Sequence, residues 1–339
     1  MLCVMCIVTL ARHAMATRFE LVLHGEDEAA LRGAGEEALD EIARLEDELS
    51  YFRPTSQVFR LNQEAAKQPV RVAPRLFSLL QQAQRLSAET GGTFDITVAP
   101  LMRCWGFYQR EGRVPEPDPL AEARACVGMN WVELNEADST VRFTRAGVQL
   151  DLGSIGKGYA VERAGELLRE AGVTSALLHG GTSTVLAIGA PPDAAGWKIA
   201  LEHPANAQEK IPSSKDAPPV GAWSLELGAF VPLATVTLRD QSLSVSAVWG
   251  KSFTAADQSY GHVIDPRTGQ PTQGALLAAI VLPSATESDA LSTMLLTLGL
   301  DGFEQVLRLR PGMRALVAGS GTGAKPLRVE TRGFEVTAR

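Results

Sequence analysis

The sequence has few cysteines, no long apolar run and no excess of positive charge, and each absence excludes a class of protein. Four cysteines among 339 residues are too few for a disulfide framework. Cys3 and Cys6 form a CxxC pair, but without a second pair or a nearby histidine it favours an ordinary terminal segment over a zinc site. The net charge of −7 argues against nucleic acid as a partner, because phosphate backbones attract basic surfaces. An acidic protein that handles an anionic ligand has to supply local positive charge or a metal.

The first ten residues, MLCVMCIVTL, are apolar but lack a basic start and a cleavage site. They are also far shorter than the ~20 residues that span a bilayer, so we expect no membrane span. On this sequence we expect a cytoplasmic protein. A misassigned start that removed a leader would instead make it periplasmic or membrane-associated. Residues 1–14 are therefore set apart as an N-terminal segment without a clear signal, and residues 15–339 are treated as one domain.

Apolar periodicity predicts helices and strands in an irregular order. Helical spacing predicts helices over residues 27–49, 74–90 and 155–171. Extended apolar segments predict strands at residues 15–23, 132–134, 141–144, 148–152 and 276–282, and at residues 175–188 around a break at Gly180-Gly181. Ser284 and Glu287 fit a capping box, so a further helix is expected directly after Ser284. Because strands and helices mix without a regular βαβ alternation, we expect an α+β fold with mixed or antiparallel sheets and packed helices.

Residues 204–222 (PANAQEKIPSSKDAPPVGA) are polar and rich in proline. Such a composition is typical of a connection between elements, and a stretch of this length is unusual for a simple turn. We therefore expect a loop or an insertion here.

The segment DLGSIGKGY, from Asp151 to Tyr159, places three glycines and Lys157 at a predicted strand-to-helix junction. Glycines let a backbone approach a phosphate closely, and a helix N-terminus favours anions. The segment is not a Walker motif, because Asp151 and Gly158 stand where that motif needs Gly and Ser or Thr. A glycine-rich turn with a surface lysine is an equally good interpretation of this motif alone.

The segment SDALST places Asp289 and Thr293 four residues apart, so their oxygens share one face of a helix. A sparse set of oxygen ligands suits Mg²⁺, which keeps much of its shell for water and substrate phosphates. A polar stripe near a helix start, where Asp is favoured by the helix dipole, is the plainer alternative.

Two further segments contain candidate binding or catalytic groups. In GHVIDPRTG, His262 stands at a strand–loop edge, where it is a candidate proton acceptor, although a lone histidine is more often structural. In GGTFDITVAP and the following Trp105-Gly-Phe107, a tight turn with an aromatic residue and an Asp is suited to cradling a ring system. The same turn also suits a hydrophobic anchor.

In their order along the chain, these segments resemble the ApbE family of FAD:protein FMN transferases. The resemblance runs from about Met15 to about Gly299. It is carried by MATRF, LSYFRPTS, GTFDITVAPLMRCWGF, DLGSIGKGYAVE, HGGTSTVLAIG, GHVIDPRTGQP and SDALSTMLLTLG. Several family-like segments in the right order are specific in a way that no single one is.

The resemblance implies a T-fold-related α+β architecture and transfer of FMN from FAD to a threonine or serine hydroxyl of an acceptor protein, with AMP leaving. It implies that Mg²⁺ is held by Asp289, Thr293 and the backbone carbonyl of Ser154, and that His262 is a candidate base. The residues implied to line the FAD site are Met15, Phe52, Thr93, Phe94, Asp95, Asp151, Lys157 and Ile264.

The sequence departs from the family pattern at four places. Thr182 follows the glycine pair where an acidic or amide residue is common, and Ala247-Val248 follow Ser246 where glycine and an acidic residue are common. Phe52 replaces a frequent tyrosine, and Gly156 a common alanine. Two alternatives to the transferase therefore remain in view: a hydrolase that splits FAD into FMN and AMP, and a non-catalytic flavin-binding protein.

Overall fold

The computed structural model describes residues 5–109, 111–204, 232–250, 252–256, 258–319 and 327–337. Apart from Pro204, the predicted loop or insertion at residues 204–222 lies outside these ranges. No helix within the described ranges is both long and apolar enough to cross a membrane.

The centre of the molecule is an eight-stranded sheet in which every neighbouring pair of strands is antiparallel. In spatial order its strands are β1 (Cys6–Ala14), β2 (Thr17–Gly25), β6 (Ala176–Gly180), β7 (Thr184–Ile188), β10 (Gln241–Ala247), β15 (Leu277–Leu282), β16 (Arg314–Gly319) and β17 (Arg328–Arg332). Strand β15 is apolar throughout, LAAIVL, because it is buried on both faces of the sheet. The predicted α+β class is confirmed.

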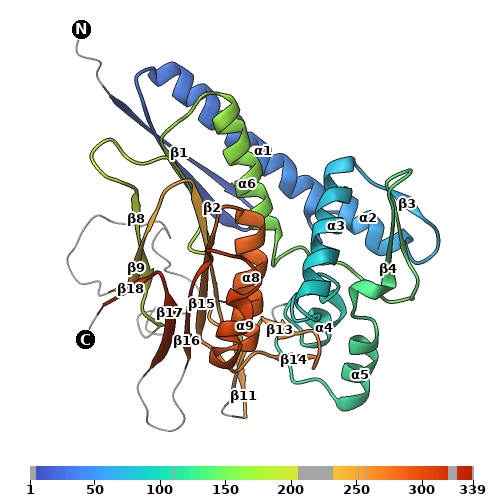
Figure 1. Cartoon of the computed structure of the whole chain (residues 1–339). Helices are drawn as coiled ribbons and strands as arrows, with labels where there is room; N and C mark the ends of the chain where they lie inside the picture. The colour runs from blue at the N-terminus through green and yellow to red at the C-terminus, as the bar shows by residue number, and fades with distance from the viewer. Residues whose placement is uncertain are drawn as a thin grey trace.

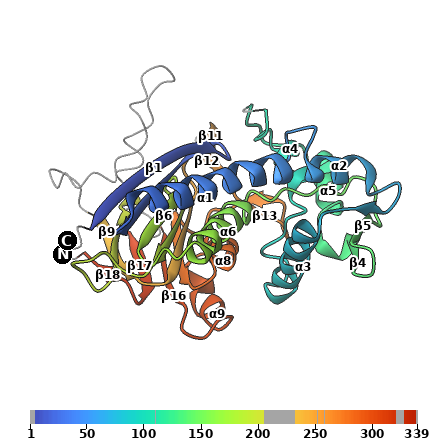
Figure 2. The same ribbon diagram turned by 90° about the horizontal axis from the view of Figure 1, so that it is seen from above.

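Three helices cover one face of this sheet, as Figures 1 and 2 show: α1 (Glu28–Leu49), α6 (Gly156–Glu170) and α8 (Ala285–Leu298). Inward residues of the strands, such as Phe19, Leu21 and Ile280, pack with these helices into the main core. The other face is covered by a three-stranded sheet of β8 (Trp197–Glu202), β9 (Pro232–Leu238) and β18 (Glu335–Val336), which encloses a second apolar core.

The segment between α1 and α6 extends to one side of this sandwich (Figure 2). It contains helices α2 (Gln57–Glu64), α3 (Pro74–Glu89), α4 (Ala99–Cys104) and α5 (Pro117–Ala125), a short 3₁₀ turn (Met129–Trp131), and the small sheet of β3 (Val70–Arg71), β5 (Thr140–Phe143) and β4 (Val132–Asn135). The remaining elements are β11 (Ser252–Ala255), β12 (Gln258–Gly261), β13 (Ile264–Asp265), β14 (Gln270–Pro271), a 3₁₀ turn (Leu300–Gly302) and α9 (Phe303–Leu307).

The four predicted helices are confirmed within one or two residues at their ends. Ser284 caps α8 as predicted, by accepting from the Glu287 amide at 3.2 Å, but the Glu287 carboxylate bonds Arg310 instead of closing the capping box. The predicted strand at residues 148–152 is wrong. Val70–Arg71 forms the third strand of the small sheet. This segment is too short to predict as a strand, and it becomes one because it pairs with β5, which lies far along the chain.

The boundary drawn at residue 15 falls inside the β1–β2 hairpin. Residues 6–14 form β1 and pair along their whole length with β2. Met15 and Ala16 form the turn, and both have positive φ, 49° and 57°. A two-residue hairpin turn with both residues in this region normally uses Asn-Gly, so the Met-Ala turn is strained.

Replacing Ala16 by glycine is expected to raise the free energy of unfolding by roughly 0.5–1 kcal/mol, because glycine adopts positive φ without the penalty of an L-residue. The exposed strand residue Ala11 provides the matched control, since Ala11→Gly loses strand preference without relieving strain. Urea unfolding measures both variants. An Ala16→Gly protein no more stable than the parent chain would contradict the assignment of strain to this turn.

Candidate functional site

The N-terminal turns of α6 and α8 meet at Gly158 and Asp289. The Gly158 amide donates to Oδ2 of Asp289 at 2.8 Å, and the Asp289 side chain is buried. A Cβ at position 158 would lie 2.3 Å from the carbonyl oxygen of Ala285 and 2.6 Å from Cβ of Asp289. Only glycine allows this approach, so Gly158 is needed for the packing of α6 against α8.

Burial raises the pKa of Asp289, while the positive charge of Lys157 and the hydrogen bond from Gly158 act in the opposite direction. Lys157 lies half-buried in the first turn of α6. A buried carboxylate is most favourable when a cation shares its site. This corner of the fold therefore holds a carboxylate suited to a metal, next to a lysine and a helix N-terminus suited to phosphate.

Thr293 lies one turn further along α8, on the side of the helix that faces β10. Its hydroxyl lies 3.3 Å from the carbonyl oxygen of Asp289 and 3.2 Å from the Ser246 hydroxyl. Among the described residues, no three His, Cys, Asp or Glu side chains gather to hold a metal. A cation bound at Asp289 would have to draw its other ligands from hydroxyl, carbonyl, water or substrate oxygens.

The turn before α6 contains Ser154 and Asp151. Because the Gly158 amide is directed at Asp289 in α8, it does not close the helical bond to the Ser154 carbonyl four residues back. Asp151 Oδ1 accepts from the Gly153 amide at 2.8 Å, and Oδ2 accepts from the Tyr108 hydroxyl at 2.5 Å. The sequence-predicted residues Asp151, Ser154, Lys157, Asp289 and Thr293 thus lie around one junction.

An aromatic cluster lies beside Asp151. Tyr51 and Tyr108 stack at 4.5 Å, and Phe52 meets both edge-on at 5.1 and 5.3 Å. Phe52 is 61% exposed, so it offers a face to a ligand, whereas burial next to Asp151 raises the pKa of the Tyr108 phenol. Tyr51 and Tyr108 were not predicted as site residues, although their positions in the sequence, directly before Phe52 and directly after Phe107, were a signal.

The predicted residues Thr93, Phe94 and Asp95 point into the protein. Phe94 belongs to the main core. Both carboxylate oxygens of Asp95 are occupied, accepting from the Thr97 amide at 2.8 Å and the Met129 amide at 3.0 Å, among others. The Thr93 hydroxyl is buried without a hydrogen-bond partner. Asp95 therefore organises this turn.

The remaining predicted residues lie on segments around this junction. His262 is half-buried after β12, and its neighbour Gly261 packs against Val248, two residues beyond Ser246. Ile264 is buried against Leu101, Trp105 and Phe107. Met15, in the strained hairpin turn, is partly buried against the main core.

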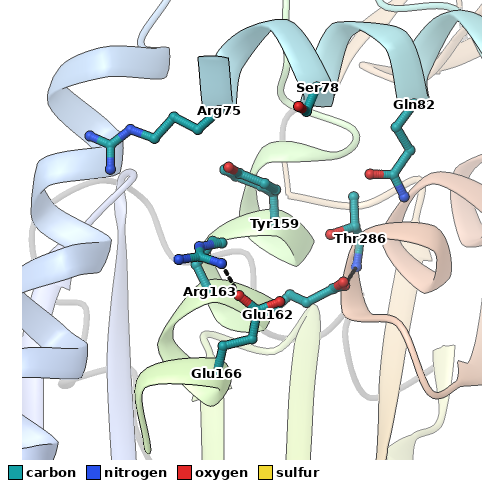
Figure 3. A pocket seen from close by; sticks show the side chains of 8 residues that line it. All are labelled: Arg75, Ser78, Gln82, Tyr159, Glu162, Arg163, Glu166 and Thr286. Atoms are coloured by element: carbon teal, nitrogen blue, oxygen red, sulfur yellow. Dashed lines mark hydrogen bonds and ion pairs between the residues drawn. The ribbon is translucent and has the colours of Figure 1, made fainter. Parts of the chain in front are cut away.

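A pocket of about 350 Å³ lies between α3, α6 and α8 (Figure 3) and contains none of the predicted site residues. Its charged groups already have partners: Glu162 accepts from Ser284 and from the Thr286 amide, each at 2.7 Å, and Arg163 pairs with Glu166. The pocket is lined by Arg75, Ser78, Gln82, Tyr159, Glu162, Arg163, Glu166 and Thr286.

The fold and this junction define the class of the protein. It is an antiparallel α+β protein with a buried carboxylate, a lysine and an exposed aromatic face at one junction. The ApbE family model matches residues 15–317. The chain is 27% identical over 320 residues to an FAD:protein FMN transferase of Klebsiella pneumoniae (strain 342), covering 92% of this chain and 84% of the relative. It is 29% identical over 302 residues to one of Treponema pallidum (strain Nichols), covering 85% and 77%.

Solved structures agree with this comparison. The ApbE protein of Thermotoga maritima matches with a TM-score of 0.78 at 25% identity, over 92% of this chain and 94% of that one. The apo flavinyl transferase ApbE of Pseudomonas stutzeri matches with a TM-score of 0.77 at 26% identity, over 96% and 95%. The chain belongs to the ApbE family, and it is an enzyme of the transferase class. The resemblance seen in the sequence and the ApbE-like architecture are confirmed.

Proposed function

We propose that this protein is an FAD:protein FMN transferase that moves FMN from FAD to a threonine or serine hydroxyl of an acceptor protein, depends on Mg²⁺ and releases AMP. The names of relatives that cover most of the chain support this proposal. The structural observation that carries it is the buried Asp289 carboxylate bonded to the N-terminal turn of α6, beside Lys157.

In the proposed reaction, the acceptor hydroxyl oxygen forms a bond to the phosphorus of the FMN half, and the bond between that phosphorus and the AMP oxygen breaks. AMP leaves with the electron pair of the broken bond, and the hydroxyl proton passes to a base. His262 is our candidate for that base. Lys157 and the α6 N-terminus would hold the negatively charged pyrophosphate in position.

Asp289, Thr293 and the Ser154 carbonyl would hold Mg²⁺. The fit rests on a buried carboxylate with a raised pKa, a hydroxyl one turn away and a carbonyl without its helical bond. These are the oxygen ligands that Mg²⁺ accepts. When bound, Mg²⁺ would neutralise charge on the pyrophosphate.

The aromatic cluster of Tyr51, Phe52 and Tyr108 would hold the flavin ring. Phe52→Ala is expected to weaken FAD binding by roughly tenfold, because an aromatic contact contributes about 0.5–1.5 kcal/mol beyond its buried area. Fluorescence titration with FAD measures this. Ile7→Ala is the control, since Ile7 is a comparably exposed apolar residue at the far end of the β1–β2 hairpin. Equal FAD affinity in the two variants would contradict the placement of the ring.

AMP release from FAD, followed by chromatography with and without an acceptor protein, tests the proposed reaction. We expect AMP release that depends on the acceptor and stops when EDTA removes Mg²⁺. Equal AMP release without an acceptor would show a hydrolase of the same bond. FAD binding without AMP release under any condition would show a flavin-binding protein and overturn the proposed chemistry.

A further inference from the structure

A row of hydroxyl groups separates β10 from α8. Strand β10 presents Ser242, Ser244 and Ser246 to the helix, because alternate residues of a strand share one face. Helix α8 presents Ser288, Ser292 and Thr293 to this strand. Ser242, Ser244, Ser288 and Ser292 are fully buried, in a position where apolar packing would be usual.

The protons of this row can be assigned by counting, because each hydroxyl has one hydrogen to donate. Ser292 donates to the carbonyl oxygen of Asp289 at 2.9 Å. The 2.8 Å contact between Ser246 and Ser292 therefore needs the proton of Ser246. Ser246 is left as an acceptor, and it lies 3.2 Å from the Thr293 hydroxyl.

The same counting leaves the Thr293 proton two acceptors, Ser246 at 3.2 Å and the Asp289 carbonyl at 3.3 Å. The carbonyl already accepts the shorter bond from Ser292, so the Thr293 proton goes to Ser246, whose own proton is given to Ser292. In that position the Thr293 proton points towards the protein. A hydroxyl that binds a cation has to turn a lone pair towards it and its proton away.

We propose that Ser246 and Ser292 are positioning residues for the metal site, which direct the Thr293 proton inward through the chain Thr293 to Ser246 to Ser292 to the Asp289 carbonyl. This inference rests on the proposed function, because it takes Mg²⁺ as the cation at Thr293. It also assigns a role to Ser246, which the sequence retains where Ala247 and Val248 depart from the family pattern.

Ser244 provides a matched control. It lies two residues before Ser246 on the same face of β10, is fully buried where Ser246 is half-buried, and bonds a serine of α8, Ser288, at 3.0 Å. Ser244→Ala therefore removes a comparable hydroxyl pair from the same layer without touching Thr293. A loss that follows from weakened packing alone would affect both variants.

The test measures Mn²⁺ binding to the full chain with FAD present. The EPR signal of free Mn²⁺ reports how much of the ion remains unbound. Asp289→Ala serves as the blank for Mn²⁺ held by FAD itself. Ser246→Ala is expected to weaken binding by about tenfold or more, as for other residues that orient metal ligands, and Ser244→Ala by no more than about twofold. The double variant Ser246→Ala/Ser292→Ala is expected to bind no more weakly than Ser246→Ala, because both residues act through one chain.

Three results would overturn this inference, and they point to different failures. Parent-level binding in Ser246→Ala, with the parent well above the Asp289→Ala blank, would exclude the hydroxyl chain and leave the proposed function in place. Equal losses of Mn²⁺ affinity in Ser246→Ala and Ser244→Ala would mean that these hydroxyl groups act through packing and not by orienting Thr293. A parent chain that binds no more Mn²⁺ than the blank would remove the metal site, and the inference with it.

Discussion

Asp289→Asn is expected to lower Mg²⁺-dependent turnover of FAD by about 10³-fold, because metal stabilisation of the transferring phosphate contributes several kcal/mol. Asparagine has nearly the shape of aspartate, and its side-chain oxygen can still accept from the Gly158 amide. The variant thus removes the charge while keeping the contact between α6 and α8. The initial rate of AMP release at saturating Mg²⁺ measures the effect.

The same variant makes a second prediction for the metal-free protein. Because burial raises the folded pKa of Asp289 above its usual value, the folded state binds more protons than the unfolded chain between the two pKa values. The stability of the parent chain therefore falls as pH rises through that window. The asparagine variant does not lose this stability, because asparagine does not titrate. In EDTA at neutral pH, Asp289→Asn is expected to unfold at a higher urea concentration than the parent, with the difference shrinking in acid.

These two measurements separate the role of the charge from the role of the fold. Turnover at the parent rate would contradict the metal assignment. An asparagine variant that is less stable than the parent at neutral pH would mean that the carboxylate is held by an interaction stronger than the desolvation that opposes it.

Gly158→Ala is expected to lower the free energy of unfolding by roughly 1–3 kcal/mol, the usual cost of overpacking, and to abolish turnover. The added Cβ would meet two atoms of α8, the Ala285 carbonyl oxygen and Cβ of Asp289, at distances that folded proteins do not show. The helices would have to separate, and separation breaks the bond from the Gly158 amide to the carboxylate. Thermal unfolding and AMP release measure the two effects.

Gly156→Ala is the control for this prediction. Its added Cβ would meet only Cβ of Leu152, at 3.7 Å, which is an ordinary contact. It lies in the same turn of α6, so alanine there is expected to be neutral or stabilising by roughly 0.5–1 kcal/mol. Comparable stability and activity in the two alanine variants would show that α6 and α8 do not depend on the close approach at Gly158.

Local patterns predicted the parts of the fold that depend on local physics. The apolar run of β15 and the Ser284 cap of α8 are encoded within a few residues, and both are present. The error at residues 148–152 has a long-range cause, because a short apolar stretch becomes a strand only if a partner lies alongside. The pairing of residues 6–14 with β2 likewise depends on a strained turn that no turn propensity favours.

The candidate site likewise has residues that local sequence patterns predict and residues that depend on long-range contacts. Spacing within a helix was enough to place Asp289 and Thr293 on one face of α8, and the glycine-rich segment was enough to suggest a helix start. Tyr108 and Ser246 were missed because their contacts, with Asp151 and Thr293, join residues 43 and 47 positions apart. The sequence also does not show which way a carboxylate in a turn points. Asp95 was predicted to line the ligand site, but its carboxylate points into the protein. The roles of the predicted ligand-binding residues remain predictions.

The most direct test of the account is the intact mass of a threonine-containing acceptor protein after incubation with this enzyme and FAD, with Mg²⁺ or with EDTA. The account predicts that the acceptor gains the mass of one covalently bound FMN in Mg²⁺ and gains nothing in EDTA. An acceptor that remains unlabelled in Mg²⁺, although the enzyme binds FAD and releases AMP, would contradict the transferase and leave a hydrolase.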